Sequence, residues 1–414
     1  MRTPRAFVLL TTAVAALPLY ARAAELHVTS STQLNWYADP LASDRDQREF
    51  GQYLRLSGTL DEKGNIGVFG YGRLTGQLTT GGETDHYWTG RFYYLYVQGR
   101  DLLDKHVDLR VGRTYVTEAA IPAVIDGAYV NLKNLAVPGL GVALFGGHRI
   151  NFDQRKEVDD IGDSLFGGSL NYAAARQTHV ELSYARRYSD GALGREAIAA
   201  EAGTTPVDNL NFFGRARYDL ADSRWNELLL QANVVPTAPL TLKGEYYASS
   251  PTFDKFSFYN YFNVTMYRQA SAGAEWQLGP RYRFFGDYAF EWFDSSQTAK
   301  RFDVGAGLNP IDNLRLTVRY EKRIGYAGGI DGVRFDGWYG LGAVALLAGI
   351  DYDDFRRDST DLTYSTRSGA ARRLWGGVSY SFTKYLDALA RVEDDFNFYF
   401  SPSYKGFVAV NVKL

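Results

Sequence analysis

The residues with the clearest chemical potential are charged side chains that recur at every second position. In residues 314–321, Arg315, Arg319 and Glu321 share one face, and leucine and valine residues share the other. Side chains of an extended strand point alternately to its two faces, so this spacing predicts strands with one charged face. Segments of this kind supply the whole set of candidate channel-lining residues: Arg215, Arg217, Asp219, Lys243, Glu245, Arg283, Asp287, Glu291, Arg315, Arg319, Glu321, Arg391 and Glu393.

Two interpretations of these charges are open. The first is a polar, water-filled channel, in which the mixture of signs predicts no strong preference for anions or cations. The second is a structural ladder of cross-strand ion pairs inside a closed lumen. We favour the channel, because a barrel of about 20 strands leaves more room than its side chains fill.

Catalytic and metal-binding patterns are missing from the sequence. The five histidines are scattered, and neither G-x-S-x-G nor H-E-x-x-H occurs. The absence of cysteine excludes thiolate metal sites, disulfides and haem attached to this chain through cysteine. Acidic segments at 153–163 and 351–358 lack the glycine-centred spacing of a calcium loop, so solvated loops are favoured over divalent-ion sites. We therefore expect no enzyme, no cofactor and no metal site.

Composition and length indicate the elements that position these charges. The chain has 414 residues, with 30 Tyr, 25 Phe and 42 Gly. Aromatic residues favour strands, and glycine favours tight turns and close strand contacts. The longest uncharged apolar stretch after residue 24 runs only from 338 to 350 and contains three glycines, so no spanning helix is expected.

The N-terminus has the features of an export signal. A basic start with Arg2 and Arg5 precedes an apolar stretch over 6–19, and Ala21-Arg22-Ala23 matches an A-x-A cleavage site. Residues 1–23 are thus expected to be a cleaved signal peptide, and residues 24–414 a single barrel. Removing the three arginines lowers the basic count from 45 to 42 against 47 acidic residues, which offers no case for nucleic-acid binding.

The alternating segments favour an all-β, transmembrane, antiparallel up-and-down β-barrel over a soluble sandwich. Nine short turns, expected on the periplasmic side, alternate with longer connections, expected on the extracellular side: 39–48, 80–87, 153–163, 189–195, 250–264, 294–299, 325–334, 357–369 and 400–404. The tally is about 22 strands, within a range of about 18 to 22. Regions 195–203 and 335–356 fit either one strand or two.

Aromatic residues near the expected strand ends predict two girdles at the membrane interfaces. The girdle candidates are Trp36, Trp88, Trp276, Tyr282, Trp292, Trp338 and Tyr385. The last strand alternates through Val410 and Val412 to Leu414. It resembles the C-terminal assembly signal of bacterial outer-membrane proteins, although these usually end in an aromatic residue. The resemblance implies recognition by the barrel-assembly machinery.

Two further segments resemble known outer-membrane barrels. Residues 109–115 and 124–130 are similar to a paired-strand pattern of porin-like barrels. Residues 251–258 resemble a loop of barrels from metal-reducing bacteria, some of which are the porin component of porin–cytochrome conduits. That resemblance implies a multihaem cytochrome as a partner chain, which would carry the haems itself.

Together these features predict an exported protein of the bacterial outer membrane, in contact with lipid and lipopolysaccharide. The primary expectation is a passive pore for ions and small polar solutes, narrowed by inward side chains or by a folded-in loop such as 250–264. The first alternative is a sheath around a multihaem cytochrome, and the second is a surface adhesin or receptor. A homo-oligomer remains open.

Overall fold

The structure, a computed structural model, describes most of the chain. The described residues are 25–38, 46–78, 88–152, 157–158, 163–174, 177–250, 266–293, 297–326, 328–356, 368–397 and 400–414. The expected signal peptide and almost all of the expected loop 250–264 lie outside these residues.

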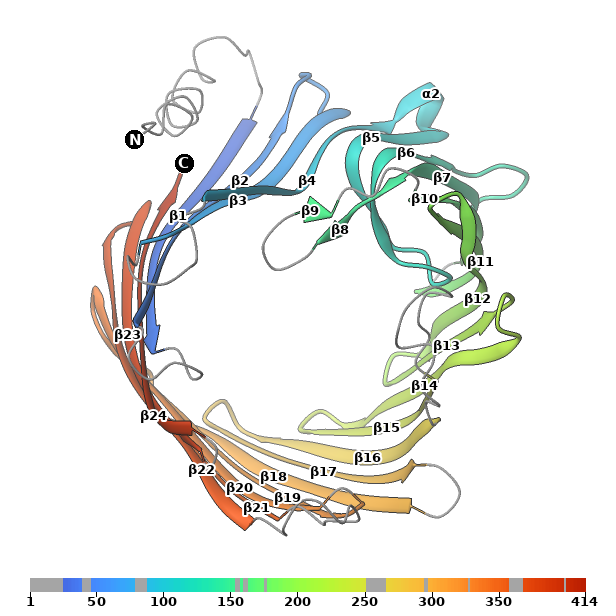
Figure 1. Cartoon of the computed structure of the whole chain (residues 1–414). Coiled ribbons are helices and arrows are strands. Elements are labelled where there is room, and N and C mark those ends of the chain that lie inside the picture. The colour runs from blue at the N-terminus through green and yellow to red at the C-terminus, as the bar shows by residue number, and fades with distance from the viewer. Residues whose placement is uncertain are drawn as a thin grey trace.

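Alternating sequence produces a single large sheet. In the described part of the chain, 22 strands pair antiparallel with their sequence neighbours, and β1 pairs with β24 to close the ring (Figure 1). The predicted fold class and the preferred strand number are confirmed. The strands before residue 164 are β1 (Glu25–Ala38), β2 (Asp46–Thr59), β3 (Ile66–Gln77), β4 (Trp88–Asp101), β5 (Val107–Val116), β6 (Ala123–Leu132), β7 (Leu140–Arg149), and a separate two-stranded pair, β8 (Asn151–Phe152) and β9 (Glu157–Val158).

The remaining strands continue around the ring in sequence order. They are β10 (Ser164–Ala174), β11 (Thr178–Ser189), β12 (Ala192–Val207), β13 (Leu210–Asp219), β14 (Arg224–Thr237), β15 (Leu240–Ser249), β16 (Tyr267–Leu278), β17 (Tyr282–Phe293), β18 (Gln297–Ile311), β19 (Leu314–Gly325), β20 (Gly329–Leu341), β21 (Val344–Arg356), β22 (Ser368–Thr383), β23 (Leu386–Asn397) and β24 (Phe400–Lys413).

The start of β1, the first described strand, meets the end of β24 at one end of the barrel. The amide of Val28 donates to the carbonyl of Leu414 at 2.9 Å, and the amide of Leu414 donates to Val28 at 2.8 Å. We call this the terminal end and the opposite end the loop end. A four-residue helical turn, α2 (Leu102–Lys105), lies in a terminal-end connection. Among the described residues, none of the helices is long and apolar enough to cross a membrane.

The structure decides two strand assignments that the sequence left open and corrects one expected loop. Region 195–203 belongs to the single strand β12, whereas 335–356 contains parts of β20 and β21, joined by a turn at 342–343. The acidic segment 351–358 is not a loop as far as Arg356, because β21 extends to that residue. Its carboxylates alternate along a strand, so Asp351 meets Arg373 of β22 across the sheet.

The β5–β6 hairpin bends away from the wall into the barrel. A row of glycines crosses the bend, with Gly112 opposite Gly127 and Gly127 opposite Gly147. A Cβ on Gly127 would lie 2.1 Å from the carbonyl oxygen of Gly146, and Gly112 has φ +121°. Only residues without a side chain permit backbones this close and this conformation. The glycines therefore allow the hairpin to turn inward.

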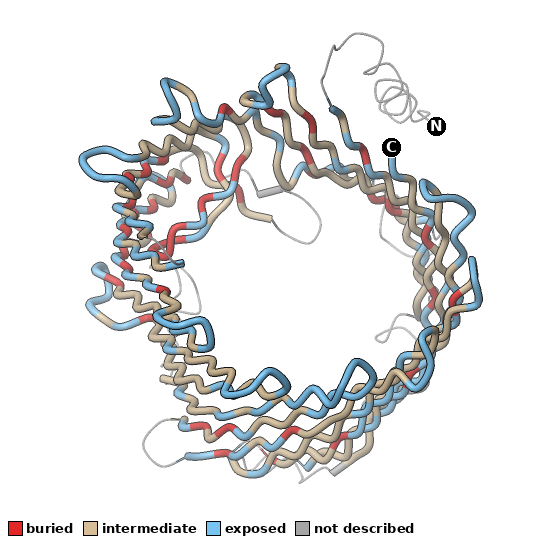
Figure 2. The backbone as a smooth tube through the Cα atoms, turned by 180° about the vertical axis from the view of Figure 1, so that it is seen from behind, coloured by how far each residue is buried: buried red, intermediate tan, exposed pale blue. Residues whose placement is uncertain are grey.

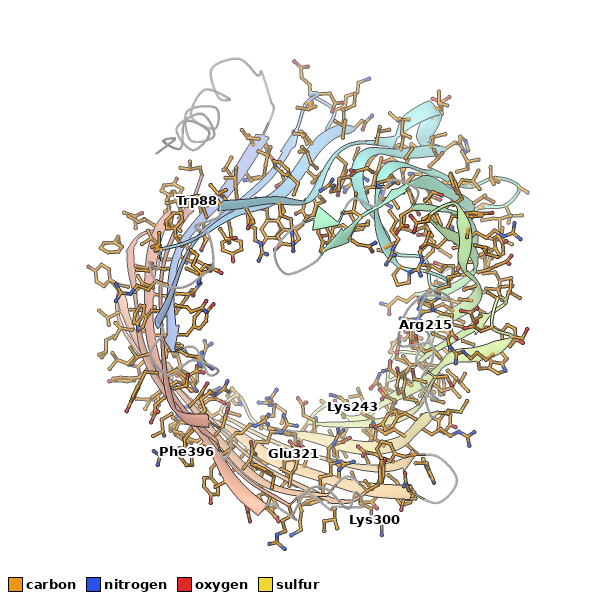
Figure 3. The ribbon with its side chains drawn as sticks, in the orientation of Figure 1. Trp88, Arg215, Lys243, Lys300, Glu321 and Phe396 are labelled. Atoms are coloured by element: carbon orange, nitrogen blue, oxygen red, sulfur yellow. The ribbon has the colours of Figure 1, made fainter. Side chains whose placement is uncertain are left out.

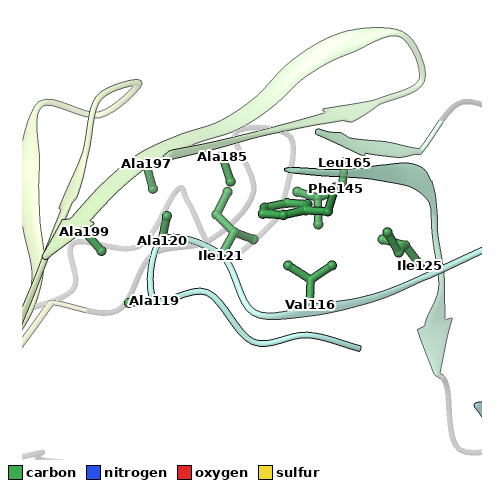
Figure 4. Packing of buried hydrophobic residues seen from close by; sticks show 10 residues of the cluster. All are labelled: Val116, Ala119, Ala120, Ile121, Ile125, Phe145, Leu165, Ala185, Ala197 and Ala199. Carbon is green, nitrogen blue, oxygen red and sulfur yellow. The ribbon is translucent and has the colours of Figure 1, made fainter. Parts of the chain in front are cut away.

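The hairpin tip supplies the main hydrophobic core. Residues 117–122, which we call the inner segment, join β5 to β6 and lie against the inner wall of β10–β13 (Figure 4). Ile121 is 2% exposed and belongs to one buried cluster with Ala185 of β11 and Ala197 of β12. In the reverse view, buried residues gather where this segment meets the wall (Figure 2). The segment is thus anchored inside the barrel by apolar packing.

Candidate functional site

The two faces of the barrel wall differ in chemistry. Arg215, Lys243 and Glu321 lie on the inner side of the ring, whereas Lys300 and Phe396 lie on its outer side (Figure 3). Because residues two apart share a face, the register extends this assignment along every strand. Large apolar side chains such as Leu182 and Leu230 are about half exposed on the outer face. The inner face carries most of the charged pairs described next.

Arg215 and Arg217 of β13 form the first group of inner ion pairs. The Nε atom of Arg215 lies 2.8 Å from Glu201 of β12, and its Nη1 atom lies 3.4 Å from Glu227 of β14. Arg217 approaches the other oxygen of Glu227 at 3.2 Å. Asp219, at the loop end of the same strand, lies 3.5 Å from Arg195. Three neighbouring strands are thus linked by alternating charges.

A second group spans β14 to β18. Glu275 of β16 lies between Lys243 at 3.7 Å and Arg283 at 3.9 Å. The Nε2 atom of Gln231 donates to Glu245 at 2.7 Å. Asp287 of β17 lies 3.6 Å from Arg301 of β18. Ion pairs at such distances with partly exposed side chains contribute about 0–1 kcal/mol each to stability. Their main effect is therefore to make the inner wall polar.

A third group covers β17 to β20. Arg319 binds Asp303 through two guanidinium nitrogens, and Glu321 lies 4.0 Å from Arg334. Glu291, which is 5% exposed, lies 2.9 Å from Arg323. These pairs continue the alternation of signs across the sheet.

Trp338 does not belong to an outer girdle, contrary to the sequence expectation. It lies opposite Arg315 in the β19–β20 register, and the Arg315 guanidinium stands 5.0 Å from the centroid of the indole. Its strand position shares the face of Arg334, which is the inner face. Tyr339 takes the outer position instead, opposite Leu314. Because the turn at 342–343 was not located, adjacent aromatic residues could not be assigned to faces.

The other girdle candidates lie on the outer side or at a strand end. Trp36, Trp88 and Trp292 lie near the loop end, whereas Trp276 and Tyr282 lie near the terminal end, and Tyr385 is exposed in a terminal-end turn. Among them, Trp36 lies against Gly406 of β24, where an added Cβ would lie 1.7 Å from the ring. That close packing fits the closure of the ring between β1 and β24.

The closing strand presents two different faces. Val410 and Val412 alternate with Ala409, Asn411 and Lys413, and β24 pairs with both β23 and β1. On the inner face of β23, Arg391 lies 2.8 Å from Glu393 and 4.2 Å from the centroid of the Trp375 ring.

The inner segment is held by hydrogen bonds as well as by its apolar core. The amide of Ala119 donates to Glu181 at 3.0 Å, and the amide of Ala120 donates to the Ser183 hydroxyl at 3.0 Å. The Nε atom of Arg217 donates to the carbonyl of Ala119 at 2.6 Å. Backbone groups taken out of water need such partners. The sequence-predicted Arg217 therefore connects the wall ladder to the inner segment.

Glu118 is the buried acid of the inner segment. It is 3% exposed, and burial raises the pKa of its carboxyl group, although a hydrogen bond from Tyr129 acts in the opposite direction. A carboxyl group in such a place favours its neutral form because the charged form loses its hydration.

Sequence reasoning missed several of these residues. The inner segment, with Glu118 and Ile121, was not identified as a connection, and Glu227, Glu275 and Asp303 were not assigned as partners. The sequence does contain one indication of the inner segment. Residues 119–121 are Ala-Ala-Ile, an apolar run at a place where an exposed turn would be polar. The ion-pair partners could not be named, because they depend on strand register.

Comparison with known protein families and with curated proteins finds no match for this sequence. The fold does match solved structures. The ferric enterobactin receptor PfeA from Pseudomonas aeruginosa aligns at 11% identity over 94% of this chain and 80% of that one, with a TM-score of 0.62.

Two other solved structures align over nearly their whole length. The P pilus usher PapC translocation pore aligns at 10% identity over 93% of this chain and 99% of that one, with a TM-score of 0.50. OccK3 from Pseudomonas aeruginosa aligns at 13% identity over 96% and 97%, with a TM-score of 0.45. At these identities the likeness concerns the fold alone. The chain is a large β-barrel of the kind found in outer-membrane proteins.

Proposed function

We propose that this protein is a passive pore of the bacterial outer membrane for ions and small polar solutes. The single observation that carries the proposal is a closed ring of 22 strands, in the described part of the chain, with charges of both signs on its inner face. A ring of this size encloses more space than its own side chains fill. A polar inner wall keeps that space hydrated.

The outer face supports the membrane part of this proposal. Large apolar side chains such as Leu144 and Phe166 are exposed there, at 55% and 52%. In the hydrocarbon of a bilayer such side chains are favourable, and strand closure satisfies the backbone hydrogen bonds that lipid does not. The terminal end would face the periplasm and the loop end the exterior, because the start of β1 and the end of β24 lie on the side of the shorter turns.

Solute passage would be governed by the inner wall. Paired charges such as Arg215 with Glu201 and Arg283 with Glu275 leave little net field, so both anions and cations would pass. The inner segment would narrow the path, because it lies inside the ring against β10–β13. The expected narrowing by loop 250–264 concerns residues outside the described part of the chain, and it stays a prediction.

Conductance of the purified protein in planar bilayers tests this proposal. A pore gives stable open steps in potassium chloride, with a current ratio for potassium and chloride close to one. The contrary result is an absence of steps from protein that is folded by circular dichroism. If such protein also co-purifies with a haem absorbance band, the sheath for a multihaem cytochrome replaces the pore.

A further inference from the structure

The inner face of β1 carries uncharged hydrogen-bonding side chains along the described stretch 29–37. Asn35 lies opposite Phe407 of β24, which in turn lies opposite Arg391 of β23, so Asn35 shares the inner face with Arg391. Because residues two apart share a face, the other inner positions of this stretch are Thr29, Ser31, Gln33 and Tyr37. The inner face of β13, by contrast, carries three of the charges described above. This sector of the wall therefore differs in chemistry from the ion-pair ladder.

A cavity lies on this sector near the terminal end, on the side of the ring where β1 and β24 meet (Figure 1). It spans neighbouring strands from β23 through β24, β1 and β2 to β3, and its volume is about 510 Å³. That volume lies within the range of about 300–1,000 Å³ that is usual for small-molecule sites. We call it the β1 pocket, and its lining includes Thr29, Gln33, Tyr53, Arg55, Tyr71 and Asn411.

Two tyrosines give the pocket flat apolar surfaces. An added Cβ on Gly51, which lies opposite Gln33, would stand 3.0 Å from the ring of Tyr53. The ring of Tyr53 therefore lies along the wall over Gly51, which leaves its other face toward the lumen. Tyr71 is held by stacking with Tyr93, with ring centroids 4.9 Å apart. A tyrosine ring binds apolar surface with its face and keeps a hydroxyl for hydrogen bonding.

Hydroxyl and amide groups lie around these rings. The Nε2 atom of Gln33 donates to the Ser31 hydroxyl at 3.1 Å, and an amide has a second N–H and a carbonyl oxygen besides. Thr29 and Arg55 are exposed on the same inner face. Hydroxyl and amide groups both donate and accept hydrogen bonds, so they suit a ligand whose own groups also do both.

The charges that line the pocket are mostly balanced. Asp387 accepts a hydrogen bond from the Nδ2 atom of Asn411 at 2.7 Å and lies 3.4 Å from the Nζ atom of Lys413. Arg55 is exposed, so water and salt screen its charge, and its guanidinium acts mainly as a set of hydrogen-bond donors. A neutral ligand therefore fits the pocket better than an ion does.

We propose that the β1 pocket binds a neutral sugar from the lumen. A pyranose ring carries hydroxyl groups around its rim and C–H groups on its faces, which is the combination of surfaces that the pocket matches. One face of the sugar ring stacks on Tyr53, and Gln33 and Arg55 hydrogen-bond its hydroxyl groups. The site rests on the pore proposed above, because a solute reaches it from inside the barrel, and it adds neutral sugars as a solute class that the pore retains.

Saturation-transfer NMR on the purified full-length protein, in the sugar-free detergent lauryldimethylamine oxide, tests the site. The probes are glucose, sorbitol, which has the hydroxyl groups but no ring, and glucuronate, which keeps the ring and adds a carboxylate. We expect transfer from the protein to glucose, strongest at the protons on one face of the ring, because that face lies against an aromatic side chain. Transfer to sorbitol should be close to background, and glucuronate should bind no better than glucose.

A matched pair of variants locates the bound sugar. Tyr53→Leu removes the ring from the pocket and should weaken glucose binding about two- to tenfold, as expected for the loss of one aromatic contact. Tyr247→Leu makes the same change on the inner face of β15, where Tyr247 shares the face of Glu245 outside the pocket, and it should leave binding unchanged. The comparison of glucose with sorbitol needs no variant, so it decides the proposal even if a substituted barrel fails to fold.

Three outcomes overturn the proposal. Equal transfer to glucose and sorbitol shows that the barrel has no site for a sugar ring. Stronger binding of glucuronate than of glucose assigns the pocket to anions, through Arg55. Equal effects of Tyr53→Leu and Tyr247→Leu place the sugar elsewhere. Potassium chloride conductance, recorded on the same preparations, reports on the pore separately: open steps without transfer to glucose reject the pocket alone, and transfer without open steps rejects the pore alone.

Discussion

Replacing Arg217 with methionine should release the inner segment from the barrel wall. The arginine donates to the carbonyl of Ala119 at 2.6 Å and approaches Glu227 at 3.2 Å. Methionine keeps much of the length of the side chain but removes both interactions. Glu227 retains Arg215 at 3.4 Å, so the carboxylate keeps one cationic partner.

The size of the effect follows from these contacts. A buried carbonyl that loses its donor costs about 1–3 kcal/mol. The lost ion pair adds at most about 1 kcal/mol, because Glu227 keeps a partner and water screens the site. A total of about 1–4 kcal/mol, at 1.4 kcal/mol for each factor of ten, increases the fraction of released segment by about 5- to 700-fold.

A buried reporter makes this release measurable. Ala185 is fully buried beneath the inner segment, and the natural chain contains no cysteine, so Ala185→Cys provides a single thiol that is reachable only when the segment lifts. The rate at which a water-soluble thiol reagent modifies this cysteine tracks the released fraction when opening is fast. Arg217→Met should raise that rate by about the factor given above.

Arg215→Met is the matched control. Arg215 contacts the same Glu227 and also Glu201, and it lies on the same strand, but both of these partners belong to the wall. The control should change the labelling rate by less than about threefold, in line with the small contribution of partly exposed ion pairs. Equal acceleration by both variants would contradict this prediction, because it would show that loss of wall charge, and not of the Ala119 contact, releases the segment.

Three further results are expected. Because burial raises the pKa of Glu118, docking of the inner segment is strongest at a pH below the ordinary carboxyl pKa and weakens as the pH rises through the raised pKa. Labelling of the thiol in Ala185→Cys, relative to an exposed thiol, should therefore increase with pH. This pH dependence should disappear when Glu118→Gln is added. Gly112→Ala should reduce the yield of heat-resistant folded barrel on gels, because φ +121° and the Leu95 carbonyl oppose a side chain. Lys243→Glu combined with Arg283→Glu should shift reversal potentials toward cation preference, since four units of charge change on one stretch of wall.

The strands and their charged faces could be predicted from the sequence, but the ion pairs across the barrel wall could not. Period two along segments such as 314–321 determines which side chains share a face. This is enough to predict the strands, and the turns between them give the strand number. It does not determine register across strands. Arg319 could therefore be placed on a charged face, whereas its partner Asp303 could not be named.

Features that depend on an interruption of the two-residue alternation could not be predicted from the sequence either. The inner segment leaves the wall because of glycines on three different strands, and their alignment is visible only in the register. Trp338 was assigned to the wrong face because one undetected turn shifts the alternation of a whole strand. Local sequence patterns therefore predicted the regular strands, but they predicted neither the inner segment nor the face of Trp338.

Cysteine scanning along β17 in a lipid bilayer tests the central claim that one face of each strand meets lipid and the other meets water. Single cysteines at Arg283 and Asp287 occupy the inner face, and those at Phe284 and Tyr288 occupy the outer face. We expect a charged, water-soluble thiol reagent to modify the first two rapidly and the last two slowly, with the pattern reversed for a reagent dissolved in the lipid. Equal modification at all four positions by the water-soluble reagent would contradict it.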